Sequence, residues 1–310
     1  MPKPIIIDCD PGHDDAIALL LAFAHPELVN VLAVTIVAGN QTLEKTVNNA
    51  LKVLSFAGVQ CEVAGGYDRP LMRPLEIADA VHGESGLDGP DLPAPTFAAS
   101  EKHGVQVIID AIRGSREKVT IVPTGPLTNV AAALVGSPDI KKNIERIVLM
   151  GGAAREGNWT PAAEFNILVD PEAASVVFQS GVPITMIGLD VTHEAQVMAA
   201  EVDYLLNSGH RVGVMVGELL EFFGEFHETM GFAGMPLHDP LAMATVLDPT
   251  IVETRHLPVT IETQGQYTTG RTVVDFYGVT GKEPNVDVAL KVDRDRFVQM
   301  VIDAVLSYDK

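Results

Sequence analysis

Four carboxylates lie close together near the start of the chain, at Asp8, Asp10, Asp14 and Asp15. So many anions in so short a segment need a neighbouring cation, and carboxylate oxygens favour a hard ion such as Ca²⁺ or Mg²⁺. The scarcity of nearby Cys and of clustered His argues against zinc. A cation of this kind makes a bound water easier to deprotonate, and a carboxylate beside it can accept the proton. The spacing therefore predicts a metal site that can activate water.

These acids stand where a strand gives way to a helix. The apolar run at 5–7 predicts a buried strand, in which Asp8 and Asp10 point to the same side. Pro11-Gly12 then turns the chain, and Asp14 and Asp15 open a helix that continues to Leu21. This junction is a strand's carboxyl edge, where open α/β sheets bind their ligands. Two other interpretations remain open: acids at a helix start are ordinarily favourable without any ligand, and Asp8 could serve only to orient its neighbours.

The same alternation of strand and helix continues along the chain. It predicts strands at 29–38, 59–64, 119–122, 144–150 and 182–189, and helices at 41–57, 102–113, 127–135 and 171–180. Such alternation predicts a mostly parallel, Rossmann-like central sheet flanked by helices. Segment 65–95 is expected to be a long irregular loop.

The last third of the chain has a different rhythm. We expect helices at 199–207, 212–227, 239–247 and 294–307, and strands at 252–263, 269–277 and 286–292. These elements would add a helical and small β decoration to the one sheet, so we predict a single domain over 1–310.

Other candidate site residues, most of them polar, follow the later strands of the expected sheet. Because the carboxyl ends of parallel strands share one edge, these residues should gather near the four acids. The set comprises Asn40, Thr124, Met150, Asn158, Glu164, Phe165, Asn166, His238 and Asp239. Taken alone, Asp239 could be only a helix cap, and Met150 and Phe165 only core residues.

Composition limits the classes of partner. The 310 residues include 21 basic and 41 acidic side chains, a net charge of −20, which repels nucleic acid polymers and anionic membranes. A neutral small substrate suits this negative electrostatic field better than a polyphosphate does. The only two cysteines, Cys9 and Cys61, argue against a disulfide framework and for a reducing compartment. With no signal-peptide pattern at the start and no membrane-length apolar run there, we expect a cytoplasmic protein.

Several motifs in order resemble those of the nucleoside N-ribohydrolases, the inosine–uridine-preferring family. The first is Asp-Cys-Asp-Pro-Gly-His-Asp-Asp-Ala at 8–16. The others lie at 35–40, 82–89, 123–129, 150–152, 157–158, 164–166 and 238–239. The resemblance thus extends along almost the whole chain.

The resemblance implies hydrolysis of the N-glycosidic bond of ribonucleosides with the help of Ca²⁺. The ion would be held by Asp10, Asp15, the backbone carbonyl of Thr124 and Asp239, and Asp14 would be the base that takes a proton from water. The ribose hydroxyls would be bound by Asn40, Asn158, Glu164 and Asn166, and the sugar pocket would be lined by Met150 and Phe165. His82 and His238 would lie near the base, with His238 a candidate proton donor. A homo-oligomer, tetramer or dimer, is expected by resemblance.

One departure leaves the base preference open. Many relatives carry a Tyr where this chain has Met230. The change to Met removes a hydroxyl from the expected base pocket and leaves His227 and His238 as candidate proton donors. We assign His13, Cys9 and Trp159 to packing or turns.

Two rival functions are compatible with parts of the pattern. A haloacid-dehalogenase-type phosphatase would use Asp8 as nucleophile and Asp10 as acid, but would leave Asp14 and Asp15 unexplained. A non-catalytic, Ca²⁺-dependent ribose-binding protein would bind nucleoside without turnover.

Overall fold

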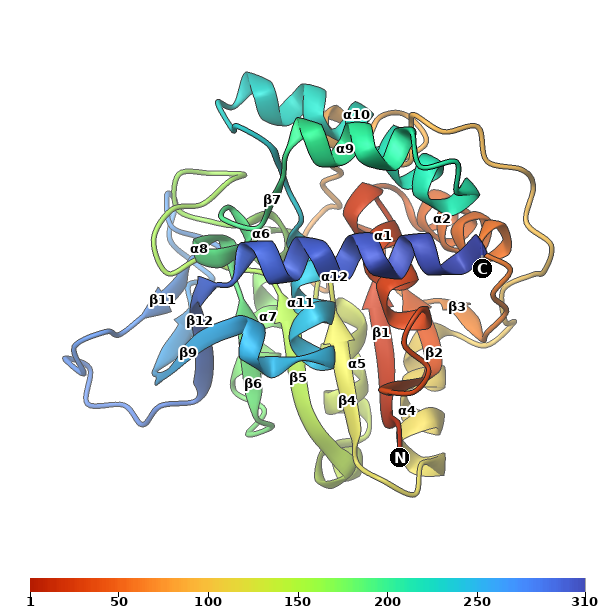
Figure 1. Ribbon diagram of the computed structural model, residues 1–310. Coiled ribbons are helices and arrows are strands. Elements are labelled where there is room, and N and C mark those ends of the chain that lie inside the picture. The colour runs from red at the N-terminus through yellow and green to blue at the C-terminus, as the bar shows by residue number, and fades with distance from the viewer. Residues whose placement is uncertain (310) are drawn as a thin grey trace.

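An eight-stranded sheet forms the centre of the molecule in the computed structural model (Figure 1), which describes residues 1–309. Lys310, the last residue of the expected domain, lies outside the described range. In order across the sheet, the strands are β3 (Val63–Gly65), β2 (Val29–Ile36), β1 (Lys3–Cys9), β4 (Val119–Pro123), β5 (Ile144–Met150), β6 (Ile184–Ile187), β12 (Val286–Val292) and β9 (Val252–Leu257). Only β9 runs antiparallel to its neighbour, so the predicted mostly parallel α/β sheet is confirmed.

Helices cover both faces of this sheet, as the alternation of side chains in β1 requires. Ile5 and Ile7 point into the core on one face and Ile6 into the core on the other. The first face is covered by α1 (His13–Phe23), α2 (Leu43–Phe56), α10 (Arg211–Thr229), α11 (His238–Leu247) and α12 (Arg294–Leu306). The second is covered by α4 (Gly104–Gly114), α5 (Thr128–Gly136) and α7 (Pro171–Phe178). β1 is therefore buried on both sides, which explains its continuous apolar run.

Smaller elements complete the chain. They are α3 (Asp79–His82), α6 (Phe165–Val169), α8 (Leu189–Thr192), α9 (Ala199–Leu206), the paired strands β7 (Gln196–Val197) and β8 (Met235–Pro236), the paired strands β10 (Val259–Ile261) and β11 (Thr272–Val274), and 3₁₀ turns at Pro138–Asn143, Pro249–Ile251 and Ser307–Asp309. Figure 1 shows α9 and α10 at the end of the sheet toward which β1 runs from the N-terminus. Within residues 1–309, no helix has both the length and the apolar character that crossing a membrane requires.

Three strand predictions need correction. The strand expected at 59–64 is only Val63–Gly65, and the one expected at 269–277 is only Thr272–Val274. The strand expected at 252–263 is divided by Pro258 into β9 and β10, which belong to different sheets. Proline lacks an N–H to donate to a ladder, which accounts for the division at this point.

The place of β1 in the sheet determines where a ligand can bind. β1 pairs with β2 on one side and with β4 on the other, so the strand order reverses at β1. In open α/β sheets the crevice for ligands lies at this reversal, beyond the carboxyl ends of the strands. The acidic segment that follows β1 therefore lies at the expected binding edge.

Candidate active site

A cavity of about 320 Å³ opens at this edge of the sheet. All the predicted site residues line it except Asp10 and Asp15. They are Asp14, Asn40, His82, Thr124, Met150, Asn158, Glu164, Phe165, Asn166, His227, His238 and Asp239. Residues more than 200 positions apart in the sequence thus meet at one cavity, as the shared edge of a parallel sheet predicts.

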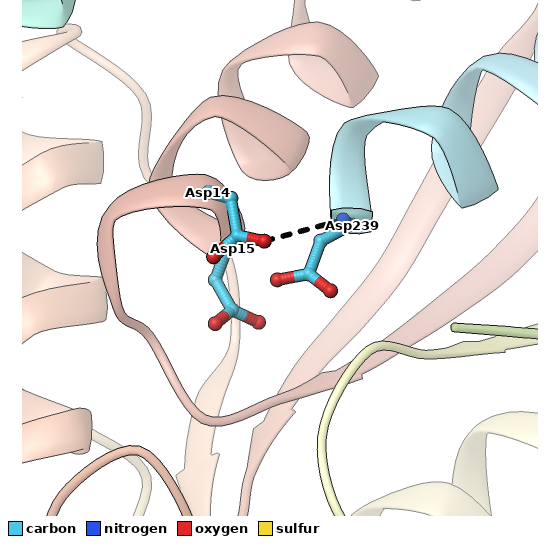
Figure 2. A group of neighbouring side chains, drawn as sticks. All are labelled: Asp14, Asp15 and Asp239. Carbon is cyan, nitrogen blue, oxygen red and sulfur yellow. Dashed lines mark hydrogen bonds between the residues drawn. The ribbon is translucent and has the colours of Figure 1, made fainter. Parts of the chain in front are cut away.

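An acidic cluster lies at one side of the cavity. Asp14, Asp15 and Asp239 each offer a carboxylate oxygen within 4.8 Å of the others. Figure 2 shows that Asp14 and Asp15 come from the first turn of α1 and Asp239 from the first turn of α11. The Asp239 N–H lies 3.4 Å from Oδ2 of Asp14, to which it donates. Because a helix N-terminus carries partial positive charge, both helix starts favour these anions.

Asp15 is fixed by donors from three other segments. Its Oδ1 accepts a hydrogen bond from the Thr124 hydroxyl at 2.7 Å. Its Oδ2 accepts from the Gly12 N–H at 3.1 Å and from Nδ2 of Asn40 at 3.0 Å. The carboxylate is therefore held in one orientation.

Asp10 is fully buried, and only one of its two carboxylate oxygens has a hydrogen-bond partner within residues 1–309. Its Oδ2 accepts from the Asn40 N–H at 2.7 Å, whereas Oδ1 is buried and has no partner within residues 1–309. Two glycines make room for the carboxylate, because a Cβ at Gly39 or at Gly125 would collide with its oxygens. A buried carboxylate oxygen with no donor is costly unless something else neutralises it.

The acids raise one another's pKa. Burial, followed by repulsion from Asp15, raises the pKa of Asp14 to about 7 and that of Asp10 well above its usual range. Burial and repulsion from Asp14 also raise the pKa of Asp239. A hard divalent cation would reduce the repulsion between these carboxylates and would give Oδ1 of Asp10 a partner, so these residues fit such an ion. The Thr124 carbonyl accepts from Nδ2 of Asn166 at 2.7 Å and keeps one lone pair for a ligand.

Asp8 has different hydrogen-bond partners from the other three acids, although its Oδ2, like Oδ1 of Asp10, is buried and has no partner within residues 1–309. It is fully buried, and its Oδ1 accepts from the Thr35 hydroxyl at 2.5 Å and from Nδ2 of Asn129 at 2.9 Å. These bonds link β1 to β2 and α5, and Asp8 does not line the cavity. Burial raises its pKa to about 7. A phosphatase nucleophile would have to face the substrate, so the phosphatase alternative is not favoured.

Histidines lie at another part of the cavity, with the rings of His227 and His238 6.2 Å apart. Nδ1 of His227 is 2.9 Å from the Phe223 carbonyl, which can only accept, so Nδ1 carries the proton and Nε2 is an acceptor. Nδ1 of His238 is 2.8 Å from the hydroxyl of buried Thr192, which has no other partner within residues 1–309. Donating to Nδ1 is the arrangement that leaves the hydroxyl hydrogen of Thr192 paired, which favours it and places the proton of neutral His238 on Nε2. Burial lowers the pKa of both rings.

The remaining walls combine amides, one acid and apolar side chains. The Glu164 carboxylate caps α6 and accepts hydrogen bonds from the backbone N–H groups of Gly152, Asn166 and Ile167. Oδ1 of Asn158 accepts from the Phe165 N–H at 3.0 Å, which leaves its NH₂ group available. Asn166 donates through Nδ2, which leaves its Oδ1 available.

Several cavity residues were missed from the sequence. Trp159, assigned to packing, lines the cavity with its ring centroid 4.8 Å from that of Phe165. Phe223 and Phe226 of α10 also line it, as do Phe232, His193, Glu156, Ala78 and Val81. On α10 the spacing of Phe223 and Phe226 is that of an ordinary buried helix face, so only the tertiary structure distinguishes them.

A family model described as inosine–uridine preferring nucleoside hydrolase matches residues 5–299. The chain belongs to this nucleoside hydrolase family. The expected resemblance is thereby confirmed, and this nucleoside hydrolase is an enzyme that acts on ribonucleosides.

Individual relatives of known name match this chain over nearly its full length. The chain is 54% identical to the pyrimidine-specific ribonucleoside hydrolase RihA of Shewanella sp. (strain MR-4), over 99% of this chain and 98% of that protein. Among solved structures, it resembles the purine-preferring ribonucleoside hydrolase from Gardnerella vaginalis with a TM-score of 0.93 and 34% identity. It also resembles the plant nucleoside hydrolase PpNRh1 with a TM-score of 0.92 and 32% identity, and each comparison covers 99% of both chains.

Proposed function

We propose that this nucleoside hydrolase cleaves the N-glycosidic bond of pyrimidine ribonucleosides, releasing base and ribose. The observation that carries the proposal is a single cavity with an acidic cluster at one part and histidines at another. The pyrimidine preference draws on the relative that is 54% identical and named pyrimidine-specific. The named purine-preferring enzyme is more distant, at 34% identity.

Carboxylates near the sugar would stabilise the transition state. Breaking the bond between C1′ and nitrogen develops positive charge on the ribose ring, which nearby anions favour. Asp14 would act as the base that takes a proton from the attacking water. It borders the cavity and its carboxylate lies beside those of Asp15 and Asp239, where it can accept a proton from a water next to the cation.

Asp10, Asp15, Asp239 and the Thr124 carbonyl would hold the cation. Every donor is an oxygen, which suits a hard divalent cation, and we propose Ca²⁺ on the basis of the family resemblance. When bound, the ion would polarise the ribose hydroxyls and make a neighbouring water easier to deprotonate. The hydrogen bonds of Asp15 to Gly12, Asn40 and Thr124 preorganise its carboxylate for this task.

The ribose would be oriented by polar groups with unused capacity. Asn158 has a free NH₂ group and Asn166 a free carbonyl oxygen, and both border the cavity. Asn40 and Glu164 would also bind hydroxyls, although each already serves a neighbour inside the protein. Buried Met150 and Phe165 would supply apolar walls, so the site would exclude bulk water from the reacting carbon.

The developing negative charge on the departing base would receive a hydrogen bond from the Nε2–H group of His238. The Thr192 hydroxyl fixes the proton on Nε2, the nitrogen with no partner within residues 1–309. His227 has the opposite tautomer in its neutral form and would instead accept a hydrogen bond in the base region. The two histidines would therefore have different roles.

A steady-state comparison of uridine, cytidine, inosine and adenosine tests the proposal. We expect free ribose from all active substrates and higher kcat/KM values for the two pyrimidine nucleosides. Phosphate release from p-nitrophenyl phosphate with no ribose release from any nucleoside would contradict the activity itself. Higher kcat/KM values for inosine or adenosine would contradict only the base preference.

We further propose that the enzyme is a single-domain, cytoplasmic homo-oligomer, a tetramer or otherwise a dimer. Its two cysteines are both free, as in a reducing compartment. Exposed Tyr267, Tyr277 and Val279 offer apolar surface for association. Light scattering on the purified enzyme measures the oligomeric state, and a monomeric mass at micromolar concentration would contradict this proposal.

A further inference from the structure

A histidine that does not line the cavity contacts one that does. His13 begins α1 and has 0% of its surface exposed. Its ring stacks with those of His82, Phe222 and Phe223 at centroid distances of 5.3, 5.2 and 5.5 Å. Nε2 of His13 lies 2.8 Å from the carbonyl oxygen of Asp88, and Nδ1 lies 3.1 Å from Nδ1 of His82. Both ring nitrogens of His13 are therefore in use.

The protons on these two rings follow from their partners. A carbonyl can only accept, so Nε2 of His13 carries a proton toward Asp88. Neutral His13 then has an unprotonated Nδ1, which must accept, so Nδ1 of His82 donates to it at 3.1 Å. The backbone N–H of His13 also faces Nδ1 of His82, but at the longer distance of 3.4 Å, so the shorter contact between the two rings decides where the proton lies. An imidazolium here would be buried among aromatic rings, with no carboxylate hydrogen-bonded to either histidine ring within residues 1–309. The neutral arrangement is therefore the favourable one.

The proton on Nδ1 of His82 leaves its Nε2 unprotonated. This nitrogen makes no hydrogen bond within residues 1–309 and is not among the polar atoms sealed in the interior, while the side chain lines the cavity. The ring reaches this place because Gly12 has no side chain, since a Cβ there would collide with the His82 ring. His82 therefore presents an acceptor to the cavity, whereas His238 presents a donor.

We propose that His13 is a positioning residue that holds His82 in the Nδ1–H tautomer, so that Nε2 accepts a hydrogen bond from an N–H or O–H group of the bound nucleoside. The identity of the ligand rests on the proposed function, whereas the tautomer does not. His82 thus favours a substrate with a donor at this position, because one with an acceptor would face an unpaired lone pair.

His13→Phe is the informative variant. It keeps an aromatic ring in the stack with Phe222 and Phe223 and removes both ring nitrogens. The backbone N–H of residue 13, which lies 3.4 Å from Nδ1 of His82, is then the remaining neighbour of that nitrogen. Because this N–H can only donate, His82 should change to the Nε2–H tautomer and present a donor to the cavity.

Ser85→Ala is the matched control. The Ser85 hydroxyl donates to Oδ1 of Asp88 at 2.5 Å, in the same loop that receives the His13 hydrogen bond, but within residues 1–309 it makes no hydrogen bond to His82. This variant weakens the loop and leaves the imidazole contact between His13 and His82 in place. Its tautomers and kinetic constants should match those of the parent.

The test is a long-range ¹H–¹⁵N correlation spectrum of the ligand-free, full-length enzyme labelled at its nine histidines. His82→Gln assigns the signals. We expect an unprotonated Nε2 on His82 in the parent and in Ser85→Ala, and a protonated Nε2 in His13→Phe. We also expect KM for uridine to rise about two- to tenfold in His13→Phe, the value of one hydrogen bond, with a smaller change in kcat.

Two results would overturn the inference. One is a protonated Nε2 of His82 in the parent, which can be read even where His13→Phe fails to fold. The other is a Ser85→Ala enzyme that reproduces the changes of His13→Phe, because the effect would then come from loosening the loop. If the enzyme released no ribose from any nucleoside, the proposed function would fail while the spectrum still decided the tautomer.

Discussion

Replacing His238 by Ala should slow the hydrolysis of uridine far more than that of p-nitrophenyl riboside. Uracil is a poor leaving group as an anion and benefits from a hydrogen bond donated by Nε2–H of His238, whereas p-nitrophenolate leaves without help. One hydrogen-bond donor placed at a developing negative charge contributes typically 10²- to 10³-fold to a rate. We therefore expect kcat for uridine to fall by about 10²-fold or more, and kcat for p-nitrophenyl riboside by less than about tenfold.

Thr192 allows a finer version of the same experiment. The hydroxyl of Thr192 lies 2.8 Å from Nδ1 of His238 and is its only hydrogen-bond partner within residues 1–309. Thr192→Val keeps the shape of this buried side chain and removes the donor that fixes the tautomer. An unpaired buried polar group costs about 1 to 3 kcal/mol, so the rate with uridine should fall by about five- to a hundredfold. Thr192→Ser keeps the hydroxyl and should remain close to the parent.

The assay is the ratio of the two kcat values, uridine to p-nitrophenyl riboside, for the parent and the three variants. The ratio should fall in His238→Ala and in Thr192→Val and stay near the parental value in Thr192→Ser. Equal losses on both substrates would refute the role of His238 as hydrogen-bond donor to the leaving group, since a general disturbance of the cavity slows both reactions alike.

Three further substitutions test the acidic side of the cavity. Asp10→Ala should lower cation affinity by about 10²-fold and abolish activity, because Oδ1 of Asp10 has no other partner; metal analysis after dialysis checks it. Asp14→Asn should retain the cation and lower kcat by about 10² to 10⁴, and a parental rate would contradict its role as base. Gly125→Ala should displace the Asp10 carboxylate, because the added Cβ would collide with it. In a calcium titration followed by thermal unfolding, we expect affinity at least about tenfold weaker and a stability loss of about 1 to 3 kcal/mol. An unchanged titration would count against a role for Asp10 in holding the ion.

The elements that position the acids could be predicted because their signals are local. The apolar run of β1, the Pro11-Gly12 turn and the helix start at His13 lie within a few residues of one another. The strand predicted at 59–64 failed for the opposite reason. Whether such a short apolar segment joins a sheet depends on its neighbour, and only Val63–Gly65 aligns with β2.

The acidic part of the site was more accessible from sequence than the histidine part. Several carboxylates in one short segment form a pattern that can be recognised in the sequence. His13 and His82, by contrast, are 69 positions apart and come into contact only in the folded chain. In the sequence, His13 cannot be distinguished from a packing residue, because a lone histidine at a helix start has no distinctive pattern. Its contact with Asp88 likewise depends on the course of an irregular loop, which periodicity cannot predict.

The two parts of the cavity are joined at the first turn of α11. Successive helical residues project about 100° apart, and here His238 turns toward Thr192 and His227 while Asp239 turns toward Asp14 and Asp15. The helix N-terminus favours the anion of Asp239, whereas the tautomer of His238 is set separately by Thr192. Because α11 packs against α1, a shift of this helix would displace a proposed cation ligand and the proposed hydrogen-bond donor together. Packing faults between these two helices should therefore impair cation binding and leaving-group assistance in parallel, whereas Thr192→Val should affect only the second.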